Sequence, residues 1–218
     1  MKAKHWKFFT FLILLCLTTI NGLAPQAQAA PAPLLQQGST SGDVWDLQFR
    51  LKLAGFYQLP LDGLYGPNTV SAVKRFQTNY GLNPDGQTGP QTWTALKKYS
   101  LNKEELDILA KVIYSEARGE SYTGQVAVGA VVMNRLQSGQ YGDNIKDVVF
   151  QKGAFTAVAD GQYWLTPDST AYMAAQDAVR GWDPTYDSMY YFNPQTATSK
   201  WIWSRPQTVQ IGNHIFAK

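Results

Sequence analysis

The sequence predicts an α+β protein that is mostly helical and ends in a small antiparallel β element. Three observations lead to this prediction. An eight-residue motif returns after 23 residues, and each copy precedes a run of apolar residues at helical spacing. Further helical patterns occupy residues 102–181. Strand-like patterns then appear at residues 189–192 and 201–203, and apolar pairs flank Gly212-Asn213, a dipeptide typical of a two-residue hairpin turn.

The N-terminal segment is typical of a cleavable secretory signal. Three lysines precede an apolar run over residues 8–20, and Ala27-Gln28-Ala29 supplies a small-residue cleavage pattern. We predict a signal peptide over residues 1–29, export across the membrane and a mature chain that begins near Ala30. A membrane span is the alternative, but the run is short for a hydrocarbon core of about 30 Å. Cys16 could hold a lipid anchor, but no small residue precedes it, so we expect no membrane anchor after cleavage.

Removal of this segment would exclude several classes of chemistry. It takes three of the 19 basic residues and none of the 16 acidic ones, so the remaining formal charge is zero and does not attract nucleic acid. His214 is then the one histidine left, and no cysteine is left. Zinc hydrolases need several His or Cys ligands, cysteine peptidases need a thiol, and no nucleophile-elbow motif supports a serine triad. Carboxylates are the leading catalytic candidates, and we expect no metal or other cofactor.

Composition and pattern divide the rest of the chain into a lead-in and two domains. Residues 30–42 are rich in Ala, Pro, Gln, Ser and Gly, which predicts a flexible lead-in. A first domain is expected over residues 43–100, and its first helix should end at Gly55, a residue common at helix C-termini. A second domain is expected over residues 101–218.

The first domain contains the internal repeat. Asp-Gly-Leu-Tyr-Gly-Pro-Asn-Thr at residues 62–69 returns as Asp-Gly-Gln-Thr-Gly-Pro-Gln-Thr at residues 85–92. Each copy combines an Asp-Gly turn with a proline suited to the first helical position, where its missing N–H is not needed. Helices should therefore begin at Pro67 and Pro90, which gives three short helices in this domain.

The helix between the two copies contains Ala-Val-Lys-Arg-Phe-Gln at residues 72–77. Paired turns around such a helix resemble the peptidoglycan-binding domain of cell-wall hydrolases, and the resemblance covers about residues 34–98. It implies a three-helix bundle that binds the glycan or the stem peptide of peptidoglycan, without indicating which residues touch the ligand. The alternative is a three-helix domain that has no ligand.

The second domain begins with a helix that contains the leading catalytic candidate, Glu116. Residues 102–105 have the pattern of a capping box, and the helix should continue to Gly119. Glu116 lies four residues after Val112 and three after Ile113, which places it on the apolar side in the last turn. Partial desolvation and the negative end of the helix dipole favour the protonated carboxyl that a general acid needs. The alternative is a structural ion pair with one of three basic residues: Lys111, Arg118 or Arg135.

Several motifs accompany Glu116. They are Val-Ile-Tyr-Ser-Glu-Ala-Arg-Gly-Glu at residues 112–120 and the segments 124–128, 132–135, 155–158, 160–161, 192–194 and Trp203. Together they resemble the spore cortex-lytic enzymes of the SleB and CwlJ type over about residues 103–218, and the domain in front favours the SleB type. The resemblance implies a lysozyme-like or resuscitation-factor-like helical catalytic domain that cleaves the MurNAc–GlcNAc strand of the spore cortex during germination through Glu116. It also implies lytic transglycosylation, a location in the cortex or cell wall, and an accessory spore protein that holds the enzyme inactive.

One glutamate can suffice for such a reaction. After the acid protonates the glycosidic oxygen, attack by the muramic 6-hydroxyl removes the need for a second carboxylate. A hydrolase would instead use a partner carboxylate about 5 to 9.5 Å away, for which the candidates are Glu120, Asp160 and Asp187. The candidate substrate-binding residues are Glu120, Gln125, Asn134, Tyr191 and Trp203.

Structural alternatives exist for most of these residues. Gln125 and Asn134 suit hydrogen bonds in a cleft, or equally a helix-start polar residue and a buried structural amide. Tyr191 and Trp203 could stack on sugar faces or fill the core, and we expect His214 to be a strand residue rather than a catalyst. Two other functions stay open. One is an N-acetylmuramoyl-L-alanine amidase, and the other is a non-catalytic wall-binding protein in which Glu116 is dispensable.

Overall fold

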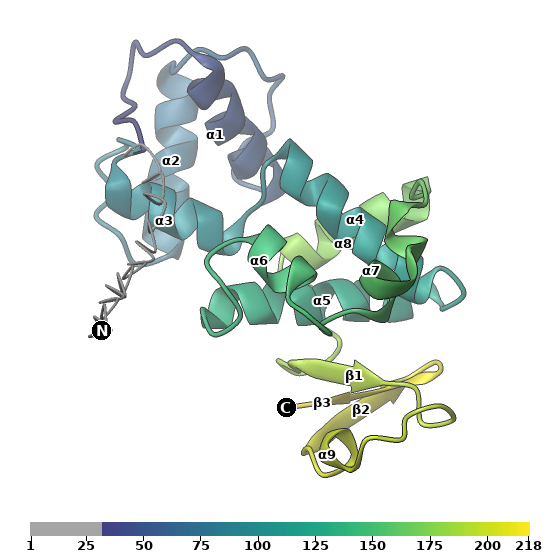
Figure 1. The fold of residues 1–218 in the computed structure, drawn as a ribbon. Coiled ribbons are helices and arrows are strands. Elements are labelled where there is room, and N and C mark those ends of the chain that lie inside the picture. Colours follow the sequence, from purple (N-terminus) through teal and green to yellow (C-terminus); the bar gives the residue numbers. More distant parts are fainter. Residues whose placement is uncertain (1–31) are drawn as a thin grey trace, which may run out of the picture. The chain divides into compact units, whose positions relative to one another are not determined.

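The computed structural model describes residues 32–218 of the chain (Figure 1). The predicted signal peptide over residues 1–29 lies outside the described residues. Among the residues that are described, no helix has both the length and the apolar character needed to cross a membrane.

The first three helices form a small bundle with its own core. They are α1 (Gly42–Leu53), α2 (Pro67–Asn79) and α3 (Pro90–Tyr99). The predicted starts at Pro67 and Pro90 are confirmed, since both prolines occupy the start of the helix. α1 begins after Ser41, whose side chain accepts hydrogen bonds from two first-turn amides. The core includes Val44, Leu47, Leu51, Val73, Phe76, Trp93 and Leu96.

The described part of the segment before α1, residues 32–41, is part of this bundle, whereas we predicted a flexible lead-in over residues 30–42. Leu35 and Thr88 exchange two backbone hydrogen bonds of 3.1 and 2.8 Å, and Tyr65 donates its backbone N–H to Ser39 at 2.9 Å. The Leu35 side chain is also buried in the core. The prediction from composition is wrong here because the repeated turns present backbone groups that need hydrogen-bond partners, and this segment supplies them.

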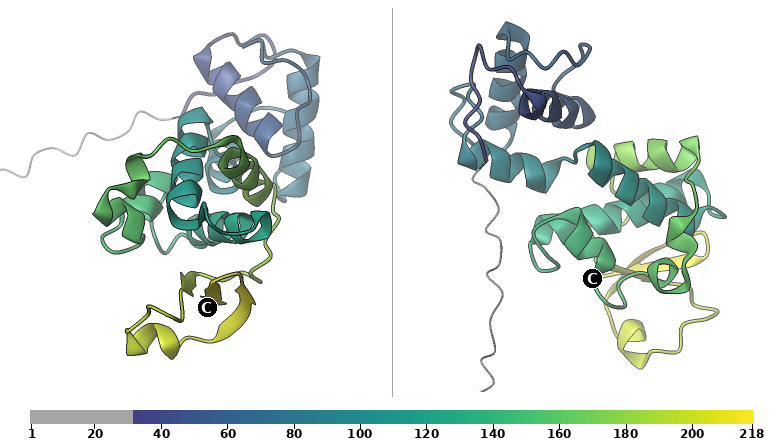
Figure 2. Two further views of the ribbon diagram at one scale, coloured as in Figure 1. Left: turned by 90° about the vertical axis from the view of Figure 1, so that its right-hand side faces the viewer. Right: turned by 45° about the horizontal axis from the view of Figure 1, so that its top comes forward.

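The next helices surround a second core. They are α4 (Lys103–Ala117), α5 (Tyr122–Ser138), α6 (Ile145–Phe150), α7 (Thr156–Asp160), the 3₁₀ turn η1 (Gln162–Trp164) and α8 (Ser169–Val179). The predicted capping box is confirmed, because Asn102 and Glu105 each accept the other's backbone N–H at 2.8 Å. α4, α5 and α8 pack against one another (Figure 2). The sequence pattern does not predict α6, α7 and η1, since elements of three to six residues are too short to show a 3.6-residue period.

A three-stranded antiparallel sheet completes the fold. Its strands are β1 (Tyr190–Phe192), β2 (Gln207–Ile211) and β3 (His214–Ala217), in the order β1-β3-β2. The predicted hairpin at Gly212-Asn213 is confirmed, and it joins β2 to β3. Phe216 of the central strand packs with Ala127 and Val131 of α5, which attaches the sheet to the helices. Figure 1 shows the sheet beside α5. The predicted α+β class is therefore confirmed.

Residues 201–203 form a helical turn, and the strand that their alternation predicts is wrong. This turn is α9 (Lys200–Trp203). The ring of Trp203 lies edge-on against Phe192 of β1, with 4.8 Å between the ring centroids. Three residues are too few to separate a period of 2 from a period of 3.6, and the packing against β1 is a tertiary contact that the pattern does not contain.

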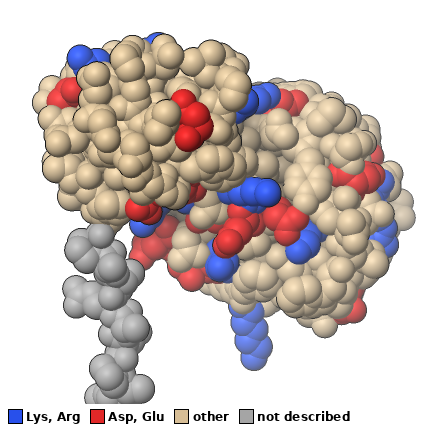
Figure 3. Space-filling view, turned by 90° about the horizontal axis from the view of Figure 1, so that it is seen from above, with Lys and Arg blue, Asp and Glu red and all other residues tan. Residues whose placement is uncertain are grey.

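The charged side chains are distributed as the balanced composition suggests. On the face shown in Figure 3, basic and acidic side chains are interspersed and uncharged residues cover most of the surface. One of the closer ion pairs joins Lys111 to Asp107 at 2.8 Å, within α4. A mixed surface of this kind gives little long-range attraction for a polyanion.

Candidate active site around Glu116

Glu116 lies in the last turn of α4, and its side chain is half-buried. Each of its two carboxylate oxygens accepts one hydrogen bond. The backbone N–H of Ala157, in the first turn of α7, donates to Oε1 at 2.8 Å. The hydroxyl of Tyr191, in β1, donates to Oε2 at 3.1 Å. Three elements that are distant in the sequence therefore fix the orientation of one carboxylate.

Tyr191 is placed by the sheet. It pairs with Phe216 of β3, and its ring lies edge-on to His214, with 5.1 Å between the ring centroids. Burial and the nearby Glu116 carboxylate raise the pKa of Tyr191 well above its ordinary value of 10.0. The hydroxyl therefore stays protonated at neutral pH and acts as a donor. Tyr191, which the sequence offered as a sugar-stacking ring, thus contacts the candidate catalytic group.

A surface pocket of about 380 Å³ opens beside Glu116. Three parts of the chain contribute to it: the end of α4 with the residues that follow, the residue directly after β1, and the β2–β3 hairpin. It is lined by residues 115–120, Asn193, Asn213 and His214. Glu116 is therefore accessible to a ligand that enters this pocket.

Glu120 lines the same pocket, but its carboxylate is occupied by the hairpin turn. Asn213 donates its side-chain amide to Oε1 at 2.8 Å and its backbone N–H to Oε2 at 3.2 Å. The fit is so close that a Cβ added at Gly212 would lie 1.9 Å from Oε2, and the φ of +57° at this residue also favours glycine. Glu120 therefore holds the hairpin against the end of α4, and its side chain is only 9% exposed.

Comparison with known proteins identifies both parts of the chain. Residues 40–96 match the family described as putative peptidoglycan binding domain, and residues 119–217 match the family described as Cell Wall Hydrolase. A spore cortex-lytic enzyme of Bacillus cereus is 42% identical over 223 residues, which cover 85% of this chain and 86% of that protein. A spore cortex-lytic enzyme of Oceanobacillus iheyensis is 39% identical over 240 residues, which cover 85% and 87%. The chain belongs to the spore cortex-lytic enzyme family.

Solved structures of this family resemble the C-terminal part of the chain. The catalytic domain of Bacillus cereus SleB is 54% identical, with a TM-score of 0.52, and the match covers 54% of this chain and 91% of that one. The catalytic domain of Bacillus anthracis SleB, described as a germination-specific lytic transglycosylase, is 53% identical, with a TM-score of 0.52 and coverage of 54% and 97%. The resemblance inferred from the sequence motifs is confirmed.

His214 also lines this pocket, although its sequence pattern indicated only a strand residue. It lies in β3, and its Nδ1 is 3.9 Å from Oε1 of Glu120. Nδ1 is buried and has no hydrogen-bond partner among the described residues. Burial lowers the pKa of His214 below its ordinary value of 6.5, although the charges of Glu120 and Glu116 oppose the shift. The imidazole is therefore neutral at pH 7.

We expect the stability of the enzyme to fall as the pH falls below 6.5, because of His214. Below that value the unfolded chain binds a proton at the imidazole, whereas the folded chain, with the lower pKa, does not, so the free energy of unfolding decreases. His214→Gln keeps every carboxylate, so a difference between the wild type and this variant over about pH 5 to 6.5 reports the imidazole. In calorimetry, Tm should fall over this range in the wild type and stay level in His214→Gln. An equal fall in both proteins would contradict the assignment.

The two polar residues of α5 that we predicted as cleft hydrogen-bonders lie outside the pocket lining. Asn134 donates its side-chain amide to Asp183 Oδ2 at 3.0 Å and to the Ser188 backbone oxygen at 3.1 Å. Gln125 donates its amide to the Glu120 backbone oxygen at 3.4 Å, and its buried Oε1 has no partner among the described residues. Both side chains thus support neighbouring segments, which agrees with the structural alternative.

The remaining candidates also lie outside the pocket lining. The indole N–H of Trp203 donates to the Ala197 backbone oxygen at 3.0 Å. Asp160 accepts two hydrogen bonds from the residue two positions further on. The Asp187 side chain is 83% exposed and forms a long ion pair at the C-terminus. Glu120, Asp160 and Asp187 are the candidates for a second catalytic carboxylate. Of these three, only Glu120 shares the pocket lining with Glu116.

Proposed function

We propose that this protein cleaves the MurNAc–GlcNAc strand of spore-cortex peptidoglycan as a lytic transglycosylase, with Glu116 as general acid and then general base. The observation that carries the proposal is the state of the two lining carboxylates. Each oxygen of both carboxylates accepts one hydrogen bond, but the donors to Glu120 belong to the hairpin turn that it anchors, and its side chain is 9% exposed, whereas Glu116 is half-buried in the pocket lining. A hydrolase needs a second carboxylate to activate water, and a lytic transglycosylase does not. The description of the Bacillus anthracis structure supports the same reaction.

The reaction needs one proton to leave Glu116 and return. The protonated carboxyl gives its proton to the glycosidic oxygen as the bond to C1 of the muramic residue breaks, which leaves an oxocarbenium-like centre. The carboxylate then takes the proton of the muramic 6-hydroxyl while that oxygen bonds to C1. The products are a 1,6-anhydro end and a new free hydroxyl, and no water is consumed.

The contacts of Glu116 suit the carboxylate that exists between these two steps. The backbone N–H of Ala157 and the hydroxyl of Tyr191 both point a donor at it. Donors that are fixed in advance stabilise a developing charge without reorganisation during the reaction. The raised pKa of Tyr191 keeps its proton on the tyrosine, so the hydroxyl orients Glu116 rather than replacing it as the acid.

Removal of the Tyr191 hydroxyl should slow cleavage while the fold is retained. Hydrogen bonds to charged groups contribute about 1.5–3 kcal/mol, so Tyr191→Phe should lower kcat by roughly tenfold or more. The packing of the ring against Phe216 does not involve the hydroxyl. Unchanged kcat in Tyr191→Phe, with an unchanged Tm, would show that the hydrogen bond does not serve catalysis.

Product analysis tests the proposed function directly. Purified spore cortex is digested, and the released fragments are examined by mass spectrometry. We expect 1,6-anhydro-muramic ends. Reducing ends would show hydrolysis, free stem peptides would show an amidase, and intact cortex would favour a wall-binding protein, so each of these three results would contradict the proposal.

The family acts on cell-wall peptidoglycan, which lies outside the cytoplasmic membrane, and we propose that residues 1–29 direct the export. N-terminal sequencing of the protein from spores should then begin near Ala30, and a sequence that begins with the original N-terminus would contradict cleavage. An accessory spore protein that holds the enzyme inactive stays a prediction from the family resemblance.

A further inference from the structure

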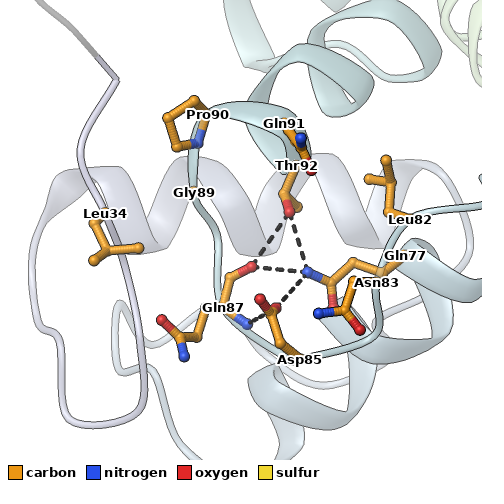
Figure 4. A pocket seen from close by; sticks show the side chains of 10 residues that line it. All are labelled: Leu34, Gln77, Leu82, Asn83, Asp85, Gln87, Gly89, Pro90, Gln91 and Thr92. Atoms are coloured by element: carbon orange, nitrogen blue, oxygen red, sulfur yellow. Dashed lines mark hydrogen bonds between the residues drawn. The ribbon is translucent and has the colours of Figure 1, made fainter.

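The two copies of the repeated turn are built by the same hydrogen bonds. A buried glutamine, Gln48 in the first copy and Gln77 in the second, donates from Nε2 to three oxygens of its turn. In the second copy these are Asp85 Oδ1 at 2.8 Å, the Gln87 backbone oxygen at 2.9 Å and Thr92 Oγ1 at 3.1 Å (Figure 4). The corresponding bonds of the first copy measure 2.7, 3.0 and 3.1 Å. The shared residues of the repeat therefore build the turn.

The exposed residues of the two copies differ. Leu64 of the first copy is 52% exposed, and its counterpart in the second copy is the exposed amide Gln87. Asn68 of the first copy corresponds to the longer amide Gln91. Neither the Gln87 nor the Gln91 side chain takes part in the hydrogen bonds that hold the second turn. The chemistry of these two side chains is therefore not needed for the fold.

A pocket of about 450 Å³ lies at the second copy (Figure 4). Three exposed amide side chains and three apolar side chains line most of it: Asn83, Gln87, Gln91, Leu34, Leu82 and Pro90. Leu34 is 60% exposed, and the pairing of the next residue, Leu35, with Thr88 brings it to this turn. The apolar side chain of Leu34 is thus exposed to solvent beside the amide side chains that line the pocket.

The lining chemistry suits a neutral ligand that has both hydroxyl and amide groups. Asp85 is the one charged lining residue, and its carboxylate disfavours an anion. Its Oδ1 accepts hydrogen bonds from the Gln77 side chain and the Gln87 backbone, whereas Oδ2 has no partner among the described residues and can accept from a ligand hydroxyl. The amides can pair with an acetamido group, and the apolar side chains can cover its methyl and a sugar face.

We propose that this pocket binds an N-acetylated sugar of the peptidoglycan glycan strand, so that the second copy of the repeat, and not the first, holds the wall. The proposal rests on the peptidoglycan substrate of the proposed function and adds the site and the part of the polymer that is bound. Catalysis at Glu116 and retention on the glycan would then use two separate pockets of one chain.

The repeat provides a matched control for the test. In the protein that bears Glu116→Gln, to prevent digestion, Gln87→Ala with Gln91→Ala is compared with Leu64→Ala and Asn68→Ala at the equivalent positions. Binding to insoluble cortex peptidoglycan is measured by sedimentation, and Tm is measured for each variant. Loss of two ligand hydrogen bonds should raise Kd about tenfold in the second-copy variant and less than about twofold in the first-copy variant. Equal losses, or an unchanged Kd in the second-copy variant, would overturn the proposal.

Competition identifies the part of peptidoglycan that binds. A tetramer of N-acetylglucosamine should displace the protein from the insoluble polymer, and purified stem peptide should not. Displacement by stem peptide alone would assign the pocket to the peptide and overturn the proposal. Failure here is distinct from failure of the proposed function, because anhydro ends released from short soluble cortex fragments depend on Glu116 and not on this pocket.

Discussion

Replacement of Glu116 by glutamine should lower the rate of cortex cleavage by about 10³-fold. Glutamine keeps the size of the side chain, and its Oε1 can still accept the hydrogen bond from the Ala157 backbone. It has no acidic proton to give to the glycosidic oxygen and no negative charge to receive one, so both steps of the reaction lose their catalyst. Release of muropeptides from purified cortex measures the effect.

A matched control is available on the same helix. Glu104 lies in the first turn of α4 and is exposed, so Glu104→Gln should retain the activity of the wild type. Tm and binding to insoluble peptidoglycan should be unchanged in both variants. If Glu116→Gln kept more than a tenth of the activity, another residue would have to be the general acid.

Replacement of Gln77 by leucine should destabilise the first three helices more than any exposed substitution in them. The side chain is 1% exposed, and its amide donates to Asp85, Gln87 and Thr92 and accepts the backbone N–H of Gly86 at 2.9 Å. Leucine fills a similar volume but removes this partner from two buried groups, the Gly86 backbone N–H and the Thr92 hydroxyl. At about 1–3 kcal/mol for each unsatisfied group, the loss should reach roughly 3 kcal/mol or more.

Calorimetry measures this loss as a fall in Tm of roughly 10 °C or more for the transition of the bundle. Gln37 is exposed, so Gln37→Leu makes the same chemical change without burial and should leave Tm nearly unchanged. Binding to peptidoglycan should be lost together with the bundle. Similar Tm values for the two variants would show that the buried amide does not hold the turn.

Local signals in the sequence predicted the helix boundaries well. Pro67 and Pro90 each follow an Asp-Gly turn, and Asn102 with Glu105 forms a capping box, so the evidence for each start lies within a few residues. The flexible lead-in that we predicted over residues 30–42 is wrong for the described residues 32–41, and the reason is that their partners are distant in the sequence. Its hydrogen-bond partners, such as Thr88, lie about fifty residues further along the chain and are not visible in its composition.

The site shows the same division between local and distant information. The sequence placed Glu116 on the apolar side of its helix and in the last turn, and both features are seen. It offered Tyr191 only as an aromatic surface and gave no reason to pair it with this carboxylate. Residues 155–158 were recognised as a motif, but the donor they supply is a backbone N–H, which no side-chain pattern reveals.

The sequence by itself determined the repeat, the starts of the main helices, the family and the identity of the catalytic candidate, because each of these depends on residue types at short spacing. Only the tertiary structure decided which polar residues meet. It placed Tyr191 and the Ala157 backbone on Glu116, and it occupied Glu120 with Asn213. Those contacts join residues up to 93 positions apart, and such pairs are set by how β1 and the hairpin pack on the helices rather than by any local pattern.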